Sequence, residues 1–324
     1  VGGQGDEGQK EGRKVPGMAV FAATFDCQCY CGACSSETFR KTFGKKMMEK
    51  EKMGAIVGVS KGSIEEPRFI IMEYKGGNKT DAPLVFVGKG VTFDSGGINL
   101  KSSQALSEMH MDMSGGAAAI CATAAIAEMK LPVNVIALVP AVENMPSGSG
   151  YRPGDVLLSR SGVTIEVGNT DAEGRVILSD ALDFAKQYKP QIIVDLATLT
   201  GSAMAALGQR MAGLFTAQDD LADEFLRIGE ETGDYLWRLP MTEEYEEEIK
   251  GTSADISNAS KVRYGDAIHG ALFLKRFVGN SPWAHLDIAP TMTSTDGQYL
   301  AKGATGTGVR VLIALAEARA KQKS

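Results

Sequence analysis

The chain alternates between short apolar runs and longer stretches in which apolar residues recur at helical spacing. A short, uninterrupted apolar run is typical of a strand buried on both faces, whereas helical spacing is typical of a helix that covers a sheet. Apolar residues at Ile177, Leu178, Ala181, Leu182 and Ala185, for example, share one side of a helix. The pattern predicts strands at residues 55–59, 69–74, 84–87, 133–139, 163–167, 191–196 and 283–287, and helices at residues 37–52, 114–129, 177–188, 221–232, 270–278 and 308–319.

Strands that alternate with helices predict an α/β fold with a mostly parallel or mixed central sheet and helices on both faces. We expect one such domain over residues 53–324, after an irregular segment at residues 1–52. With 44% hydrophobic residues, the chain has enough apolar material for the core of such a domain. In folds of this kind, functional sites gather beyond the carboxyl ends of the strands, where this sequence also concentrates polar residues.

The charge and the apolar runs of the chain bear on its partners and its location. The formal net charge is −6, which argues against a nucleic-acid partner because contacts with phosphates need a basic face. No apolar run reaches the ~18 residues that a membrane-spanning helix needs. Residues 1–14 lack the apolar core of a secretion signal. We therefore expect a cytoplasmic protein without a membrane partner.

Acidic residues flanked by glycine follow several of the predicted strands. Asp94 lies in Phe-Asp-Ser-Gly-Gly, Asp112 precedes Met-Ser-Gly-Gly, and Asp171 and Glu173 lie in Asn-Thr-Asp-Ala-Glu-Gly-Arg. Each residue alone is typical of a helix cap or a turn. Together they would repel one another unless cations lay between them, so the pattern favours a metal site. Carboxylate oxygens suit Mg²⁺, Mn²⁺ or Zn²⁺, and a lysine nitrogen among the ligands favours Zn²⁺, Mn²⁺ or Co²⁺.

Several motifs resemble those of the leucine aminopeptidase family, the cytosolic two-metal exopeptidases that include bacterial aminopeptidase A. The resemblance extends from about residue 53 to residue 317. It implies a two-metal aminopeptidase that hydrolyses the N-terminal peptide bond of short peptides and prefers apolar N-terminal residues such as leucine. The matching motifs are Gly-Lys-Gly at 88–90, Phe-Asp-Ser-Gly-Gly at 93–97, Glu-Asn-Met-Pro-Ser-Gly at 143–148, Asn-Thr-Asp-Ala-Glu-Gly-Arg at 169–175, Asp-Leu-Ala-Thr-Leu-Thr-Gly at 195–201 and His-Leu-Asp-Ile-Ala at 285–289.

The resemblance also implies ligands for two divalent ions, Mn²⁺ or Zn²⁺, with Co²⁺ or Mg²⁺ as alternatives at an exchangeable site. Asp94 and Glu173 resemble the carboxylates that bridge both ions, and Asp171 resembles the ligand of the exchangeable ion. Lys89 and Asp112 resemble ligands of the tighter ion. A lysine amine can ligate a metal only when it is deprotonated, and an adjacent dication lowers its pKa.

Two further side chains resemble catalytic groups of the family. Lys101 is similar to the lysine that polarises the scissile carbonyl, and Arg175 is similar to the arginine that holds a bicarbonate as general base. An ammonium group at Lys101 would stabilise a developing oxyanion. The family's substrate contacts, which line the pocket for the N-terminal side chain or bind the substrate backbone, fall on Met109, Thr198, Leu199, Gly201, Ala289 and Met292.

The first 52 residues depart from the family pattern. Family members carry a separate N-terminal domain, which we expect to be absent here. The spacing of Cys27, Cys29, Cys31 and Cys34 is foreign to the family; it suits a soft-metal site, and a thiol-bearing segment without a metal is the alternative. Because the family forms hexamers, we expect self-association through the catalytic domain alone, as a hexamer or a trimer.

Two other functions stay open from the sequence. Some relatives have a second role in DNA binding or regulation, and a chain of this fold can also serve as a catalytically inactive scaffold. The acidic net charge argues against DNA binding. The presence of every expected ligand, together with Lys101 and Arg175, argues against an inactive scaffold.

Overall fold

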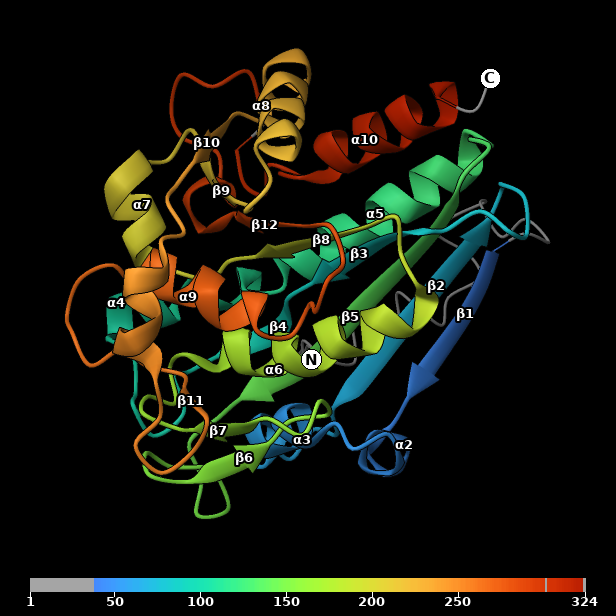
Figure 1. Ribbon diagram of the computed structural model, residues 1–324. Coiled ribbons are helices and arrows are strands. Elements are labelled where there is room, and N and C mark those ends of the chain that lie inside the picture. Colours follow the sequence, from blue (N-terminus) through green and yellow to red (C-terminus); the bar gives the residue numbers. More distant parts are fainter. Residues whose placement is uncertain (1–37, 301, 323–324) are drawn as a thin grey trace, which may run out of the picture.

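The core of the molecule is a mixed sheet, seen in a computed structural model that describes residues 38–300 and 302–322 (Figure 1). The strand order is β1-β2-β5-β3-β8-β12-β9-β10, and β4 pairs with β5 beside this path. The central neighbours β5, β3, β8 and β12 are parallel, whereas β1–β2, β2–β5 and β12–β9 are antiparallel pairs. This arrangement confirms the expected fold class. The strands are β1 (Thr38–Phe43), β2 (Arg68–Lys75), β3 (Leu84–Gly88), β4 (Gly90–Asp94), β5 (Asn134–Asn144), β8 (Ile192–Ala197), β9 (Ala212–Phe215), β10 (Leu236–Arg238) and β12 (Trp283–Asp287).

Helices cover both faces of this sheet (Figure 1). Successive side chains of a strand point to opposite faces, so each central strand contributes to two apolar clusters. In β8, Ile193 packs in the cluster under α6 and α9, whereas Val194 packs in the cluster under α5, α8 and α10. The first face is covered by α2 (Lys45–Lys50), α3 (Gly54–Ser60), α6 (Glu173–Ala185) and α9 (Asp266–Lys275), and the second by α5 (Ser114–Glu128), α8 (Asp219–Thr232) and α10 (Val309–Lys321).

Shorter elements connect these layers and shape the edge of the sheet where the parallel strands end. A small second sheet has the order β11-β7-β6, and β6 contacts α3. The remaining short elements are β6 (Val156–Leu158), β7 (Thr164–Glu166), β11 (Ile256–Ser257), α4 (Ser103–Leu106), α7 (Gly201–Leu207), and the 3₁₀ turns η1 (Met109–Met111), η2 (Lys186–Tyr188), η3 (Glu243–Ile249) and η4 (Ala289–Thr291).

The helix that the pattern predicts at residues 37–52 is wrong in its first half. Residues 38–43 form β1, which pairs antiparallel with β2, and only α2 at the end of the segment is helical. Thr and Phe favour strands, and Gly44 separates β1 from α2. The charged side chains of β1 are tolerated because, among the described residues, it lies at the edge of the sheet, and edge strands commonly carry charged side chains.

The strand that the pattern predicts at residues 55–59 is also wrong, because this segment is the helix α3. Its side chains are buried around most of the helix, so the run lacks the helical spacing that a half-exposed helix shows. Its first turn is held from outside: Asp180 Oδ2 accepts the N–H groups of Ala55 at 2.9 Å and Ile56 at 3.0 Å. A short apolar run does not distinguish a buried helix from a strand.

The sequence also led to expectations about membrane-spanning helices and about the cysteine cluster near the N-terminus. Within the described residues, no helix is both long and apolar enough to span a bilayer. The cluster Cys27, Cys29, Cys31 and Cys34 lies outside the described residues, as does most of the segment 1–52.

Candidate metal centre and substrate cavity

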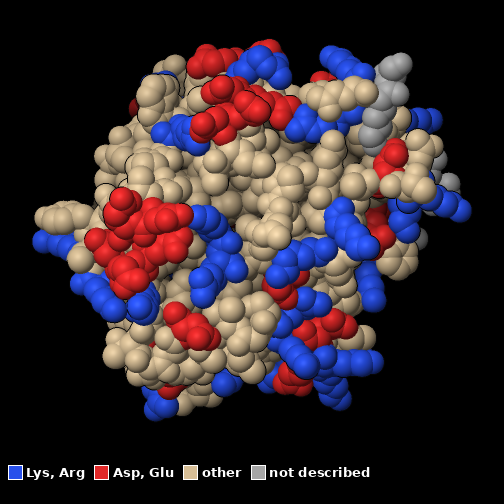
Figure 2. Space-filling view, in the orientation of Figure 1, with Lys and Arg blue, Asp and Glu red and all other residues tan. Residues whose placement is uncertain are grey.

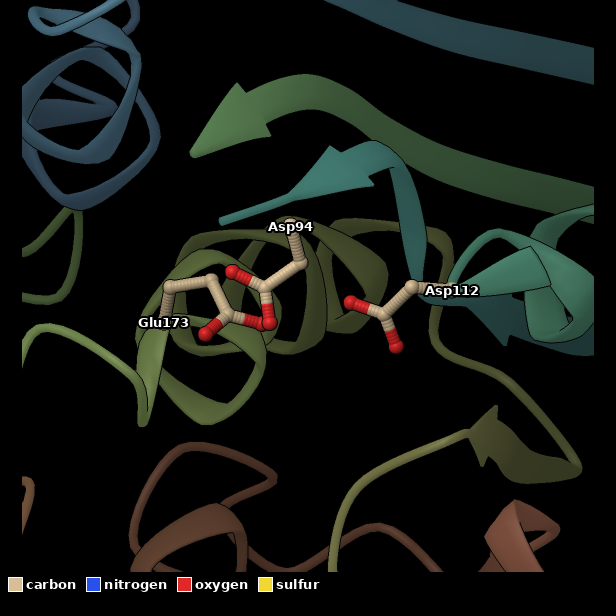
Figure 3. A group of neighbouring side chains, drawn as sticks. All are labelled: Asp94, Asp112 and Glu173. Atoms are coloured by element: carbon tan, nitrogen blue, oxygen red, sulfur yellow. The ribbon is translucent and has the colours of Figure 1, made fainter. Parts of the chain in front are cut away.

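The ligands expected from the sequence meet at the carboxyl edge of the parallel strands. Lys89 lies between β3 and β4, Asp94 ends β4, and Asp112 follows η1 just before α5. Asp171 and Glu173 lie where the chain enters α6. Asp94, Asp112 and Glu173 are buried and point toward one another, each with a carboxylate oxygen within 4.8 Å of the others (Figure 3). This group can hold a metal ion.

Glycine permits two close approaches in this centre. A Cβ atom built on Gly174 would lie 2.8 Å from Lys89 Nζ, so α6 can begin against the lysine because residue 174 has no side chain. Gly96 has a φ of +86°, a conformation that favours glycine. It lies in the turn after β4, and its N–H donates to Asp94 Oδ1 at 2.9 Å. That turn leads the chain to Lys101, which faces back to Asp94.

Lys89 connects three segments of the site. Its Nζ lies 2.8 Å from Asp112 Oδ1 and 2.8 Å from Glu173 Oε1, and it donates to the Thr198 carbonyl at 3.0 Å. Burial alone would lower the pKa of Lys89, but the carboxylates of Asp112 and Glu173 outweigh burial and raise this pKa above its usual value. In the absence of a metal ion, Lys89 is therefore a buried ammonium group that neutralises part of the acidic cluster.

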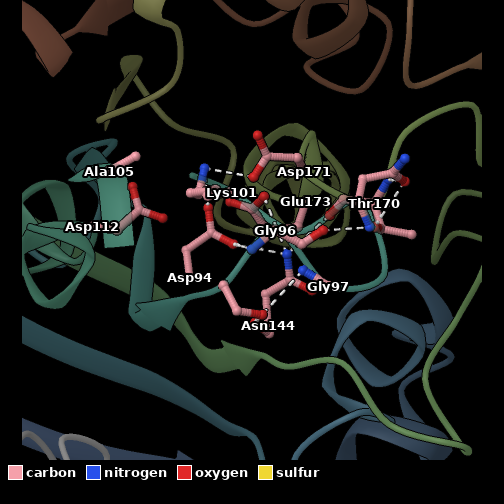
Figure 4. Close-up of polar contacts among 12 residues, drawn as sticks. Asp94, Gly96, Gly97, Lys101, Ala105, Asp112, Asn144, Thr170, Asp171 and Glu173 are labelled. Carbon is pink, nitrogen blue, oxygen red and sulfur yellow. Dashed lines mark hydrogen bonds and ion pairs between the residues drawn. The ribbon is translucent and has the colours of Figure 1, made fainter. Parts of the chain in front are cut away.

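Lys101 also lies between two carboxylates, on the side of the centre that is more open to solvent than the side of Lys89. Its Nζ lies 2.8 Å from Asp94 Oδ2 and 2.5 Å from Asp171 Oδ1 (Figure 4). Burial alone would lower the pKa of Lys101, but the carboxylates of Asp94 and Glu173 raise it overall. The side chain thus keeps its charge, and it lies at the boundary between the carboxylates and the cavity described below.

The carboxylates repel one another in spite of these lysines. Burial, followed by the neighbouring Asp94 carboxylate, raises the pKa of Glu173 to about 8. Burial also raises the pKa of Asp112 to about 6, against the opposing effect of Lys89. Asp112 Oδ2 is buried and lacks a hydrogen-bond partner within the described part of the chain. Four carboxylates and two ammonium groups leave a net charge of −2 when all are ionised, so this oxygen-rich donor set fits divalent cations.

Polar side chains that the sequence analysis did not single out hold the ligands in place. Asn144 ends β5, and its Nδ2 donates to Asp94 Oδ1 at 2.8 Å and to the Thr170 carbonyl at 2.9 Å (Figure 4). Asn99 and Thr170 bond reciprocally: the Thr170 N–H donates to Asn99 Oδ1 at 2.9 Å, and the Asn99 N–H donates to Thr170 Oγ1 at 3.0 Å. These bonds tie the loop after β4 to the loop before α6. Asn144 and Thr170 lie inside family-like motifs, which are the only sequence signal that marks them.

A cavity of about 400 Å³ opens beside the carboxylates. Lys101, Asp94, Asp112 and Asp171 contribute to its wall, so ligands and cavity share one space. Met204 of α7 also lines it and was missed, because the pattern did not predict α7. The lining includes every substrate contact that the resemblance implies, namely Met109, Thr198, Leu199, Gly201, Ala289 and Met292.

Arg175 lies apart from the cavity lining, in the first turns of α6, and is buried. One terminal nitrogen donates to the Asn258 carbonyl at 3.0 Å, and the other pairs with Asp266 Oδ1 at 2.8 Å. Its Nε is buried and lacks a hydrogen-bond partner within residues 38–300 and 302–322. The guanidinium therefore retains at least one unpaired donor that an anion can use.

Fold and site together define an α/β protein with a buried carboxylate and lysine centre at the edge of a mixed sheet, next to a largely apolar cavity. A model of the catalytic domain of the cytosol aminopeptidase family matches residues 21–313, and the chain belongs to this family. The match begins at residue 21, within the segment 1–52 that was expected to be irregular. The motif resemblance, by contrast, begins at about residue 53.

Curated relatives from several bacteria carry the name probable cytosol aminopeptidase. The relative from Syntrophotalea carbinolica is 49% identical over 274 residues, which cover 84% of this chain and 55% of the relative. The relative from Chlorobium limicola is 50% identical over 84% of this chain and 54% of its own length. The relative from Geobacter sulfurreducens is 50% identical over 82% of this chain and 54% of its own length. The chain thus spans about half the length of these relatives.

Proposed function

We propose that this chain is the catalytic part of a two-metal aminopeptidase that removes apolar residues such as leucine from the N-terminus of short peptides. The observation that supports this proposal most directly is the placement of the buried acidic cluster beside the cavity. A site that binds a side chain next to a metal centre can position the first peptide bond of a substrate for hydrolysis. The membership of the cytosol aminopeptidase family supports the same reaction.

Lys89, Asp94, Asp112, Asp171 and Glu173 are the residues that would hold two divalent ions, with Mn²⁺ or Zn²⁺ preferred and Co²⁺ or Mg²⁺ as alternatives. When bound, such ions lower the pKa of water and polarise a carbonyl oxygen. The lysine must lose its proton to become a ligand, and the dications would drive that loss.

Other side chains of this site would take part in the reaction besides the metal ligands. In the metal-free site nearby carboxylates raise the pKa of Lys101, so this side chain is an ammonium group there. As an ammonium group beside the bound substrate, it would stabilise the negative charge that develops on the scissile carbonyl oxygen. Arg175 would hold a bicarbonate, which would relay protons as general base, through its remaining donors. Thr198 and Leu199 would orient the substrate backbone. The cavity would bind the N-terminal side chain, and its methionine and leucine lining favours an apolar one.

Hydrolysis of leucine p-nitroanilide tests the proposed reaction. Metal-free protein should be inactive, and Mn²⁺ or Zn²⁺ should restore activity. Asp94→Ala and Glu173→Ala should lose the most activity, because each would serve both ions. Lys101→Ala should lower kcat by roughly 100-fold, the scale for losing one oxyanion stabiliser, while both metals stay bound. Full activity after verified metal removal would contradict the two-metal proposal.

The surface charge does not favour the DNA-binding alternative. Figure 2 shows acidic side chains gathered over the regions of α8 and η3. Both elements carry acidic residues in their first turns, Asp219 and Asp220 in α8, and Glu243, Glu244 and Glu246 in η3. Such surfaces would repel the phosphates of a duplex. A cytoplasmic location is part of the proposal and agrees with the names of the relatives.

A further inference from the structure

A buried carboxylate outside the proposed catalytic set connects two walls of the substrate cavity. Asp287 ends β12 and is fully buried. The cavity wall includes residues 198–201, which follow β8, and Ala289 of η4, which follows β12. These two strands are adjacent and parallel, with Asp287 opposite Ala197. Asp287 therefore lies where both wall segments leave the sheet.

The Asp287 carboxylate accepts hydrogen bonds from both segments. Its Oδ1 accepts the N–H groups of Leu199 at 3.2 Å, Thr200 at 3.4 Å and Ala289 at 3.2 Å. Its Oδ2 accepts the Thr200 hydroxyl at 2.6 Å, and that hydroxyl accepts the Ala203 N–H at 3.1 Å in the first turn of α7. An unpaired buried N–H group lowers the stability of the fold. The hydrogen bonds to Asp287 therefore favour the present position of these backbone N–H groups.

The same wall segment is fixed to the metal centre on its other side. Lys89 Nζ donates to the Thr198 carbonyl at 3.0 Å, and the Thr198 hydroxyl donates to Asp112 Oδ1 at 2.6 Å. The backbone at residues 198–200 is thus held between the ligand group and Asp287. A shift of this backbone would change the separation between the metal centre and the apolar part of the cavity, which includes Leu199.

We propose that Asp287 is a positioning residue that sets the shape of the cavity and, through it, the selectivity for the N-terminal side chain. The inference rests on the proposed aminopeptidase function. Asp287 is not part of the cavity lining, so it acts through Leu199, Thr200 and Ala289, which are. Its loss would loosen the wall while the ligand carboxylates remain in place.

The substitution Asp287→Ala tests this role, with Asp287→Asn as the conservative variant. Alanine removes all of the acceptors, whereas asparagine keeps an Oδ1 atom that can still bind the backbone N–H groups. For Asp287→Ala we expect KM for leucine p-nitroanilide to rise roughly tenfold, the scale of one lost hydrogen bond to a charged group, with a smaller change in kcat. The preference for leucine over alanine p-nitroanilide should fall, metal content should stay unchanged, and Asp287→Asn should restore most of the preference.

Asp180→Ala is the matched control. Asp180 is fully buried too, and its carboxylate accepts three backbone N–H groups, those of Ala55, Ile56 and Arg160, none of which belongs to a residue of the cavity lining. Both alanine variants should lower the melting temperature, but only Asp287→Ala should alter the leucine preference. If Asp287→Ala does not fold, Thr200→Val removes the hydroxyl that joins Asp287 to α7, and Thr200→Ser restores it.

The outcomes separate this inference from the proposed function. Hydrogen exchange by mass spectrometry should be faster over residues 197–207 in Asp287→Ala, and unchanged there in Asp180→Ala. An active wild type whose leucine preference survives in both Asp287→Ala and Thr200→Val overturns the positioning role alone. A metal-loaded wild type that cleaves neither p-nitroanilide overturns the proposed function, and the selectivity role of Asp287 with it.

Discussion

Glu173 shows how burial and neighbouring charge in the metal centre change the acidity of a carboxyl group. It is fully buried, and its pKa of about 8 means that the metal-free protein holds a proton on this carboxyl group at neutral pH. Asp112, with a pKa of about 6, gains a proton only in more acidic solution. A metal ion and these protons compete for the same oxygen atoms, so metal binding must be linked to pH.

We therefore expect the affinity for Mn²⁺ to increase as the pH rises through the pKa of Glu173. Below about pH 8 metal binding displaces the proton of Glu173 as well as the proton that Lys89 must lose, so affinity should fall by about a hundredfold for each pH unit of acidification, and more steeply once Asp112 is also protonated. Isothermal titration in buffers of different ionisation enthalpy measures both the affinity and the protons released. In Glu173→Gln this titrating group is gone, so the pH dependence should become shallower by about one factor of ten per pH unit, and the remainder reports the proton lost by Lys89. Equal affinities at pH 6 and pH 8 in the wild type would contradict the linkage.

At the residue scale, the sequence pointed to carboxylates that lie together in the fold, but not to the side chains that hold them in place. Gly-flanked carboxylates and family-like motifs pointed to the ligands, which do meet in the fold. The bonds between Asn99 and Thr170 join residues 71 positions apart. Asp287 reaches Thr200 across 87 positions. Such contacts depend on how loops return to the sheet edge, and neither residue type nor local spacing reveals that path.

At the scale of elements, buried parallel strands were the easiest to predict. The runs at β3, β8 and β12 are buried on both faces, so each reads as a continuous apolar segment. The same property made α3 resemble a strand, because this helix is also buried around most of its surface. Its conformation depends on Asp180, which lies 125 positions away from Ala55.

This dependence makes α3 a sensitive test of long-range anchoring. Asp180→Ala leaves the buried N–H groups of Ala55 and Ile56 and the part-buried N–H group of Arg160 without their acceptor, so it should lower the free energy of unfolding by at least about 1–3 kcal/mol, the cost of one unpaired buried group. Urea unfolding would measure the loss, and faster hydrogen exchange at residues 55–56 would locate it. Arg160→Ala is a useful comparison, because it removes a neighbouring side chain while the Arg160 N–H still donates to Asp180 Oδ1 at 2.7 Å. Equal stability of Asp180→Ala and the wild type would show that α3 does not need this anchor.

At the scale of the whole molecule, the layered arrangement follows from the order of the elements. The alternation of strands and helices in the sequence was enough to predict a sheet with a layer of helices on each face. The antiparallel pairing of β1, β2 and β5, by contrast, depends on which strands become neighbours across long connections, so the pattern left parallel and mixed sheets open. Within the part of the chain that the structure describes, the sheet ends in β1 on one side and β10 on the other.

The last prediction concerns assembly of the whole chain. We expect self-association through the catalytic domain, because the family resemblance implies hexamers and because such contacts would restrict access to short peptides. The described surface offers large apolar side chains for contacts, among them Trp237 at 57%, Tyr264 at 78% and Tyr299 at 75% exposure. Size exclusion with light scattering should give a mass near six or three times 34.3 kDa.

The competing outcome is non-specific aggregation through an edge of the sheet. Aggregates would give a broad mass distribution that grows with concentration, whereas a closed assembly keeps one mass across a wide concentration range. If deletion of residues 1–36 sharpens a broad distribution, the N-terminal segment is the cause and the catalytic domain still assembles. A monomer with full activity on leucine p-nitroanilide at every concentration would show that the fold and its cavity suffice, and that assembly plays no part in catalysis.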